Sequence, residues 1–339
     1  MSIILENQVC VFLNAKFVGY SHHEHTIAKY INFTQFENVF YLKQEKVLST
    51  EWQEQQPRRT QFYHSVLVNN QFDEVLIWNG NFEYQQTFLS CLQTYPNIQK
   101  QFAEVGWFDQ SNSIYIDPYG VNGKSLLAKT CPPALNHSEL EKVSGFITEY
   151  TKDYLRVNCA SNTLKILVPL QVDTDSNILN HSPFSSMQAF IDFLADWLPD
   201  KNVEIIVRPH PKATYNYALK SNRKDFIFDA SGDIKSKIAE SDIVIGINST
   251  ALIQALAFRK PVMAFGESVY SSSDAVHKVA VDPPFCVPQY NEKASLELIA
   301  ELKFNQQIAT RKAVANTLYK YIKQRINLLR VKRYITEQT

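Results

Sequence analysis

The stretch Val244-Ile-Gly-Ile-Asn-Ser-Thr-Ala-Leu-Ile253 is a short apolar run that passes directly into a helical pattern. Such runs are typical of buried parallel strands, because helices cover both faces of a parallel sheet. Four similar runs occur in the same half of the chain: 164–168, 203–207, 225–228 and 262–265. A helical pattern over 185–198 separates two of them, and this alternation indicates βαβ units. The second half is therefore predicted to be a Rossmann-like α/β domain.

The first half has the same rhythm, with apolar runs at 9–13, 38–42, 74–78 and 113–117 that also predict parallel strands. Cys131-Pro-Pro-Ala breaks the pattern, and a helical stretch over 140–155 follows it. A chain of 339 residues is long enough for two cores. We expect an N-terminal Rossmann-like domain at 1–155, a C-terminal one at 156–310 and a basic helix at 311–339.

The composition argues against several classes of protein. No apolar run approaches the roughly 20 residues of a membrane span, and the first residues lack a signal-peptide pattern, so we expect a cytoplasmic protein. The five cysteines are scattered and fit neither a disulfide framework nor a zinc site. Lys+Arg and Asp+Glu both number 34, so no net charge attracts nucleic acid. The basic helix could touch the inner face of an anionic inner membrane or pack back on a domain, and both interpretations stay open.

Two strand ends in the second half carry acidic or basic side chains. Pro169-Leu-Gln-Val-Asp-Thr-Asp-Ser-Asn-Ile178 follows one strand and contains Asp173 and Asp175. Carboxylates in such a turn can cap a helix, act in catalysis or hold a divalent ion, and spacing alone does not decide among these roles. The next strand ends in Arg208-Pro-His-Pro-Lys212, whose three basic side chains suit a phosphate or a carboxylate.

A third strand end offers backbone N–H groups. Asn248-Ser-Thr250 lies where a strand passes into a helix, and the first turn of a helix has unpaired N–H groups that bind anions. Ser and Thr are also common helix caps. Glu267 follows the next strand, where a carboxylate can accept from ribose hydroxyls. No glycine-rich phosphate loop and no Gly-x-Ser-x-Gly elbow occurs, which argues against ATP, NAD and serine-hydrolase chemistry.

Together these motifs resemble the capsule-polysaccharide family of β-Kdo transferases, which use CMP-Kdo. First-half motifs join them: Trp78-Asn-Gly80, Glu104-Val-Gly106 and Tyr115-Ile-Asp-Pro-Tyr-Gly-Val-Asn122. The resemblance implies an α/β fold of the GT-B type, with two Rossmann-like domains facing a central cleft. The N-terminal domain would serve the acceptor and the C-terminal domain the CMP-sugar. Kdo would pass with retention from CMP-β-Kdo to a saccharide or lipid-linked acceptor in capsule or O-antigen synthesis, without a metal or another cofactor.

The resemblance also implies roles for individual residues. Asp175 is expected to be the nucleophile, with Asp173 as the alternative, and Glu104 to be the acid/base that deprotonates the acceptor hydroxyl. The donor site is expected to contain Gln171, Arg208, His210, Pro211, Lys212, Asn248, Ser249, Thr250 and Glu267. Within this set, Arg208 and Lys212 would bind the Kdo carboxylate and the phosphate, and His210 with the helix start would stabilise the departing CMP.

Three other functions fit parts of the same pattern. A sialyltransferase or other CMP-ulosonate transferase would share the phosphate motifs but differ at the catalytic carboxylates. A nucleotide-sugar epimerase of GT-B-like fold would use UDP-sugars and need no acceptor. A non-catalytic subunit of a capsule-assembly complex would need none of the carboxylates, and the joint presence of Asp175, Glu104 and His210 argues against it.

Overall fold

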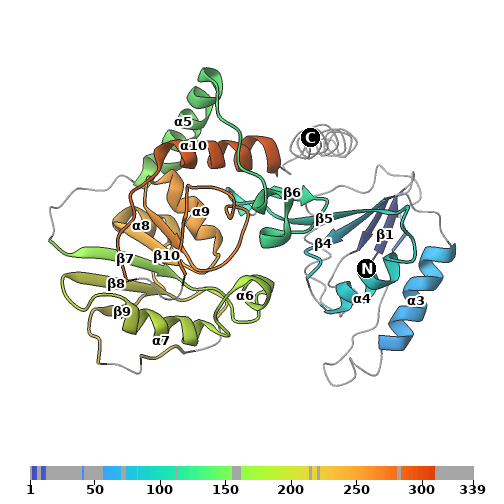
Figure 1. Cartoon of the computed structure of the whole chain (residues 1–339), viewed down its shortest axis with the longest axis horizontal. Helices are drawn as coiled ribbons and strands as arrows, with labels where there is room; N and C mark the ends of the chain where they lie inside the picture. Colours follow the sequence, from blue (N-terminus) through green and yellow to red (C-terminus); the bar gives the residue numbers. More distant parts are fainter. Residues whose placement is uncertain are drawn as a thin grey trace. The chain divides into compact units, whose positions relative to one another are not determined.

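The computed structural model describes residues 2–5, 9–12, 40–41, 56–69, 74–81, 83–110, 113–154, 162–213, 216–219, 222–280 and 284–309. They form two compact units (Figure 1). The first contains the described residues up to Leu126 together with those from Gln306 onward, and the second contains Leu127–Asn305. None of the described helices is long and apolar enough to cross a membrane.

The second unit is built on a six-stranded sheet in which every neighbouring pair is parallel. Its order is β12-β11-β10-β7-β8-β9. The strands are β7 (Leu164–Pro169), β8 (Val203–Arg208), β9 (Phe226–Phe228), β10 (Ile243–Gly246), β11 (Val262–Ala264) and β12 (His277–Lys278). Counted along the chain this is the order 3-2-1-4-5-6 of a doubly wound Rossmann-type sheet, as predicted for this half.

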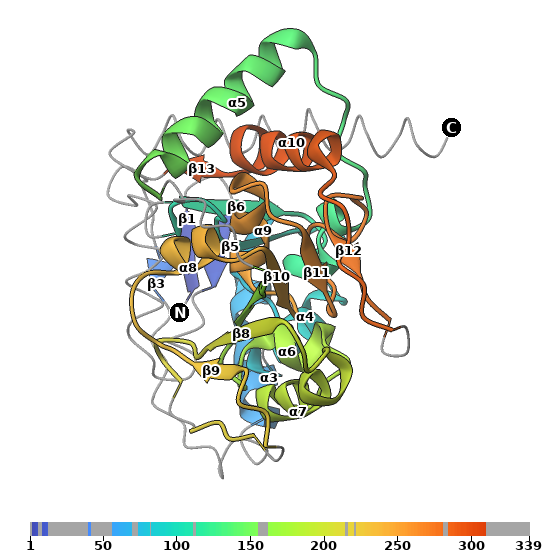
Figure 2. The same cartoon turned by 90° about the vertical axis from the view of Figure 1, so that its left-hand side faces the viewer.

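Helices cover both faces of this sheet (Figures 1 and 2). They are α5 (His137–Thr151), α6 (Ser176–His181), α7 (Met187–Trp197), α8 (Ile234–Glu240), α9 (Thr250–Ala257) and α10 (Glu292–Ala300), with a 3-10 turn η5 (Lys152–Tyr154) and a π-helical turn η6 (Glu301–Gln306). The amphipathic pattern over 185–198 is confirmed: α7 buries Phe190, Ile191 and Leu194 in a core that includes Ile166 and Ile205. Alternate strand residues face the opposite side, where α8 contacts β7 and α9 contacts β10.

The first unit has a mixed seven-stranded sheet of order β13-β6-β5-β4-β2-β1-β3. Its elements are β1 (Ser2–Leu5), β2 (Val9–Phe12), β3 (Phe40–Tyr41), β4 (Glu74–Trp78), β5 (Gln99–Val105), β6 (Ser113–Asp117), β13 (Ile308–Ala309), α3 (Gln56–Asn69), α4 (Glu83–Leu92), η3 (Asn122–Lys124) and η4 (Leu126–Ala128). The prediction of parallel strands holds for β2 and β4 but is wrong for β3 and β6, which pair antiparallel. The loop 106–112 between β5 and β6 is too short for a parallel crossover, which needs about a dozen residues.

The boundary between the units differs from the one expected near residue 155. Val143 and Ile147 of α5 are buried, α5 contacts α9 and α10, and Phe146 meets Phe304 edge-on, so the helix packs on the second unit. The chain returns to the first unit at its other end. There Gln307 Oε1 accepts from the backbone N of Trp107 at 2.9 Å, and β13 pairs with β6. The basic helix predicted at 311–339 lies outside the described residues.

Candidate functional site at the carboxyl ends of β7, β8 and β10

The doubly wound order places a natural binding crevice between β7 and β10. The connections from these two neighbouring strands leave in opposite directions, and ligands of such sheets bind outside the carboxyl ends of the strands at this point. β8 lies beside β7, and Pro169 pairs with Arg208 at the last register position. All three predicted strand-end motifs therefore come to the same edge of one sheet.

Asp175 is the N-cap of α6 and is held by its neighbours. Its Oδ1 accepts from the backbone N of Asn177 at 2.9 Å. Burial raises the pKa of Asp175 above its ordinary value, while hydrogen bonds from Asn177 and Gln171 and the charge of His210 oppose the rise. The structure thus brings Asp175, Gln171 and His210 together.

The carboxylate of Asp173 is hydrogen-bonded to the start of α7 and to Tyr217. Its Oδ1 accepts from the backbone N of Met187 at 2.6 Å, and its Oδ2 accepts from the hydroxyl of Tyr217 at 3.4 Å. Burial and the neighbouring Asp173 charge raise the pKa of Tyr217 to about 12, so the phenol stays a donor. Both oxygens of Asp173 therefore have a structural task.

Arg208 ends β8 and His210 follows it, and the two side chains have different surroundings. Arg208 is 8% exposed, and its two terminal nitrogens donate to the backbone carbonyls of Ser231 and Gly232 at 2.7 Å each. His210 is half-buried, and its Nδ1 accepts from the backbone N of Lys212 at 3.1 Å. This bond places the proton of the neutral ring on Nε2.

The charge state of His210 follows from the same surroundings. Burial and the charge of Lys212 lower the pKa of His210, and the nearby Asp175 only partly opposes them. His210 is therefore neutral at pH 7 and offers an Nε2–H donor. Lys212 and Pro211 are exposed beside it.

Asn248 connects three segments of the crevice. Its side chain is 5% exposed, and Nδ2 lies 3.0 Å from the carbonyl of Asn177, 3.3 Å from that of His181 and 3.4 Å from that of Glu267. Its backbone N donates to Oε1 of Gln171 at 3.4 Å. Asn248 thus positions the loops after β7, β10 and β11 relative to one another.

The start of α9 presents its first helical turn to the crevice. Ser249 is the N-cap, and its hydroxyl accepts from the backbone N of Ala251 at 3.3 Å, while Thr250 begins the helix. The unpaired N–H groups of a first helical turn and the helix dipole both favour a phosphate. Both residues are half-buried, so a ligand can reach this turn.

The loop after β11 approaches the crevice through Gly266 and Glu267. A Cβ at Gly266 would lie 2.6 Å from the carbonyl oxygen of His181, so the close approach requires glycine. The side chain of Glu267 is 73% exposed, and its Oε2 lies 3.7 Å from Nδ1 of buried His181. Sequence reasoning missed His181, Asn177 and Tyr217, because no motif marks a residue that acts through its backbone carbonyl or through another side chain.

Glu104 lies in the first unit, on β5. Its Oε2 accepts from Nδ2 of Asn79 at 2.7 Å and its Oε1 from the backbone N of Val105 at 2.9 Å. Asn79 and Gly80 have φ of 62° and 85°, so the Trp78-Asn-Gly80 motif is the turn that directs Asn79 toward Glu104. The predicted catalytic role of Glu104 stays a prediction.

The motif over 115–122 builds a structured loop in the first unit. The hydroxyl of Tyr115 accepts from the backbone N of Asn122 at 2.9 Å, and its ring stacks on Trp107 at 4.3 Å. Asp117 is fully buried and accepts from the backbone N of Leu126 at 2.9 Å. Among the residues with described placement, no group of three or more His, Cys, Asp or Glu could hold a metal ion.

Comparisons with known proteins agree with this geometry. Residues 134–275, which include every second-unit residue of the site, match the family described as capsule polysaccharide biosynthesis protein. Over 210 residues the chain is 26% identical to Protein FixF of Sinorhizobium fredii; these cover 60% of this chain, and the chain spans about half the length of that relative. The predicted resemblance to the capsule-polysaccharide family is confirmed by the family match.

Two solved structures share the fold. The β-Kdo 2,7 transferase of Thermosulfurimonas dismutans KpsC superposes with a TM-score of 0.52 at 18% identity, covering 82% of this chain and 96% of that one. The β-Kdo 2,4 transferase of the same KpsC has a TM-score of 0.50 at 14% identity, covering 75% and 87%. The predicted fold class, α/β of the GT-B type, is confirmed.

Proposed function

We propose that this chain is a retaining β-Kdo glycosyltransferase that moves Kdo from CMP-β-Kdo to a glycan or glycolipid acceptor in the synthesis of a capsule or O-antigen polysaccharide. The observation that carries the proposal is the convergence of a half-buried carboxylate, a neutral histidine and a helix N-terminus at the switch point of the second unit. The names of the two KpsC structures, which are β-Kdo transferases, support the choice of sugar.

The crevice suits a CMP-linked sugar because different groups are available for the phosphate of CMP and for the carboxylate of Kdo. The start of α9 at Ser249 and the Nε2–H of His210 provide donors for the phosphate, and they stabilise the charge that grows on CMP as it leaves. Lys212 is exposed at the rim and is the cation available to the Kdo carboxylate. Arg208 is already bonded to two loop carbonyls, so in this proposal it positions the loop after β9 and does not bind the sugar.

Retention follows from two displacements at the anomeric carbon. The Asp175 carboxylate attacks that carbon, and the bond to the phosphate oxygen of CMP breaks with its electron pair on oxygen. The acceptor hydroxyl then gives its proton to Glu104 and attacks the same carbon, and the Asp175 carboxylate is released. Each step inverts the centre, so the product keeps the configuration of the donor. Asp175 suits the first step because burial leaves its charge poorly solvated.

The experiment is a transfer assay with CMP-Kdo generated in situ, synthetic glycan acceptors and NMR assignment of the product anomer. A β-linked Kdo product from wild type supports donor and stereochemistry together. An α-linked product would overturn the double displacement. Consumption of CMP-sialate without CMP-Kdo would favour a sialyltransferase, and conversion of a UDP-sugar without acceptor would favour an epimerase. A parallel titration with CMP alone separates a lost donor site from a wrong acceptor.

A further inference from the structure

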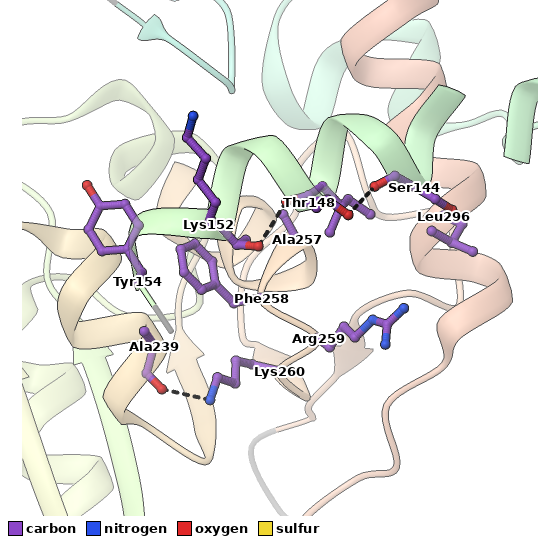
Figure 3. Close-up of a pocket in the computed structure, with 12 residues that line it drawn as sticks. Ser144, Thr148, Lys152, Tyr154, Ala239, Ala257, Phe258, Arg259, Lys260 and Leu296 are labelled. Carbon is purple, nitrogen blue, oxygen red and sulfur yellow. Dashed lines mark hydrogen bonds between the residues drawn. The ribbon is translucent and has the colours of Figure 1, made fainter. Parts of the chain in front are cut away.

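A second cavity lies in the same unit, at the other end of α9 from the proposed donor site. It has a volume of about 540 Å³ and is formed by α5, the ends of α8 and α9, and α10 (Figure 3). Cavities of this size hold small ligands in many proteins. Ser249 begins α9 at the donor site, whereas Phe258 and Arg259 follow its last turn and line the cavity.

The lining combines an apolar floor with polar ends. Phe258, Ile147 and Leu296 supply apolar surface, and the ring of Tyr154 meets that of Phe258 edge-on at 5.9 Å. Arg259 and Lys152 also line the cavity, but Nζ of Lys152 already pairs with Oε1 of Glu149 at 2.7 Å. A guanidinium beside an aromatic floor suits a ligand that is apolar on its ring faces and carries a negative charge.

Hydroxyl groups line one wall of the cavity. Thr148 and Thr151, on successive turns of α5, donate to the carbonyls of Ser144 and Ile147 at 3.0 and 2.9 Å. Because their hydrogens are used, their oxygens can act only as acceptors for ligand hydroxyls. Lys260 also lines it, but its Nζ donates to the carbonyls of Ala239 and Ser241 at the end of α8.

The backbone of Arg259 is unusual for its residue type. With φ of 54° it occupies the left-handed position after α9, and the helix closes with two bonds, Arg259 N to the Leu256 carbonyl at 3.0 Å and Lys260 N to the Ala255 carbonyl at 3.1 Å. This is the arrangement in which glycine normally stands, because glycine adopts positive φ without steric cost.

Stability does not account for an arginine at this position. The carbonyls of the last turn are already satisfied, since that of Leu256 also accepts from the hydroxyl of Tyr290 at 3.1 Å. The guanidinium pairs with Glu292 at 3.2 Å, but the two side chains are 67% and 58% exposed, and exposed pairs contribute little. A side chain kept at a strained position for so small a gain in stability points to a ligand.

We propose that this cavity binds an acidic oligosaccharide, with sugar ring faces against Phe258 and Tyr154 and a carboxylate on Arg259. A planar guanidinium donates two parallel hydrogen bonds to a carboxylate, so we expect Arg259 to contribute most of the binding energy. The inference rests on the proposed function in one respect: a transferase that extends an acidic glycan meets such a chain as its own acceptor or product.

Binding is tested by calorimetric titration of the full chain with trigalacturonate, which carries a carboxylate on each sugar, and with maltotriose, which is neutral. Trigalacturonate should bind wild type, and Arg259→Gly should weaken it about tenfold, as expected for loss of one bidentate ion pair. The melting temperature of Arg259→Gly should equal or exceed that of wild type, because glycine relieves the positive φ. Glu292→Gln removes the competing carboxylate and should tighten binding about threefold.

Equal binding of maltotriose, or unchanged binding in Arg259→Gly, would overturn the proposal. Saturating CMP should leave the titration unchanged, because the cavity is distinct from the donor crevice, and competition by CMP would assign the binding to that crevice. The readout requires no turnover. If wild type does not consume CMP-Kdo but binds trigalacturonate, and Arg259→Gly binds it more weakly, the proposed function fails and the second site stands.

Discussion

Replacing the two neighbouring carboxylates one at a time separates the nucleophile from the structural residue. In Asp175→Asn the amide oxygen can still accept from Asn177, and Asn is as good a helix cap as Asp. The change also removes a half-buried charge whose pKa burial has raised. A raised pKa in the folded state means that the ionised carboxylate weakens folding at pH 7, so stability should hold or rise. Transfer should fall at least about a thousandfold, as expected for loss of a nucleophile.

Asp173→Ala should give the opposite result. It leaves the backbone N of Met187, which is 1% exposed, without its acceptor, and it removes the partner of the Tyr217 hydroxyl. An unsatisfied buried donor costs about 1–3 kcal/mol. Taking about 2 kcal/mol, and about 2–4 °C per kcal/mol for a domain of this size, the melting temperature should fall by roughly 4–8 °C. Any protein that remains folded should keep measurable transfer.

The assay pairs thermal unfolding with initial rates at a temperature where both variants are folded. Both variants are compared with wild type at saturating donor, and CMP titration checks that the crevice is intact. Active Asp175→Asn together with inactive, fully stable Asp173→Ala would exchange the two roles and refute the reasoning. Loss of activity in both with no change in stability would remove the structural role assigned to Asp173.

Three further changes test the crevice around these carboxylates. Arg208→Met deprives two loop carbonyls of a charged donor and should lower the free energy of unfolding by about 3 kcal/mol in urea titrations; an unaltered midpoint would contradict the positioning role. Gly266→Ala brings a methyl group to 2.6 Å from a backbone carbonyl and should cost about 1–3 kcal/mol and weaken CMP binding, whereas the control Gly145→Ala, in open space on α5, should stabilise by about 0.5–1 kcal/mol. Burial lowers the pKa of His210 from its ordinary value of 6.5, so the acid limb of kcat/KM should have its midpoint below that pH. His210→Gln should leave only the limb set by Asp175, and an unshifted limb would exclude His210.

The fold of the second unit could be predicted because its strands are continuous apolar runs between helical patterns. The first unit was harder. β5 has the sequence Gln-Lys-Gln-Phe-Ala-Glu-Val, and only its middle is buried, so no apolar run marks it. The short connection after β5 makes β6 antiparallel to it, and a hydrophobic pattern carries no information about strand direction. The boundary predicted near residue 155 was too late in the chain. The helix α5 precedes that point in sequence, but it packs on α9 and α10 and so belongs to the second unit.

The site could be predicted where a motif ends a strand, because topology then brings the ends together. The motifs containing Asp175, His210 and Ser249 met at one sheet edge for this reason. Residue type alone did not predict which partners a charged side chain would meet. Arg208 and Asp173 have the charge of ligand-binding residues, yet their polar atoms bond to backbone groups and, for Asp173, to the Tyr217 hydroxyl of the protein itself. Only the three-dimensional partners distinguish a side chain that holds a loop from one that meets substrate.

In the proposed reaction, burial has two effects in this crevice. It leaves the ionised carboxylate of Asp175 less solvated, which raises its pKa and makes it more reactive, and it lowers the pKa of His210, which keeps the imidazole neutral. A charged imidazolium beside the nucleophile would pair with it and reduce its reactivity. A neutral ring whose Nδ1 accepts from Lys212 still donates through Nε2 to the leaving phosphate. The bond from the backbone of Lys212 therefore sets the tautomer of His210, whereas burial and the charge of Lys212 keep the ring neutral.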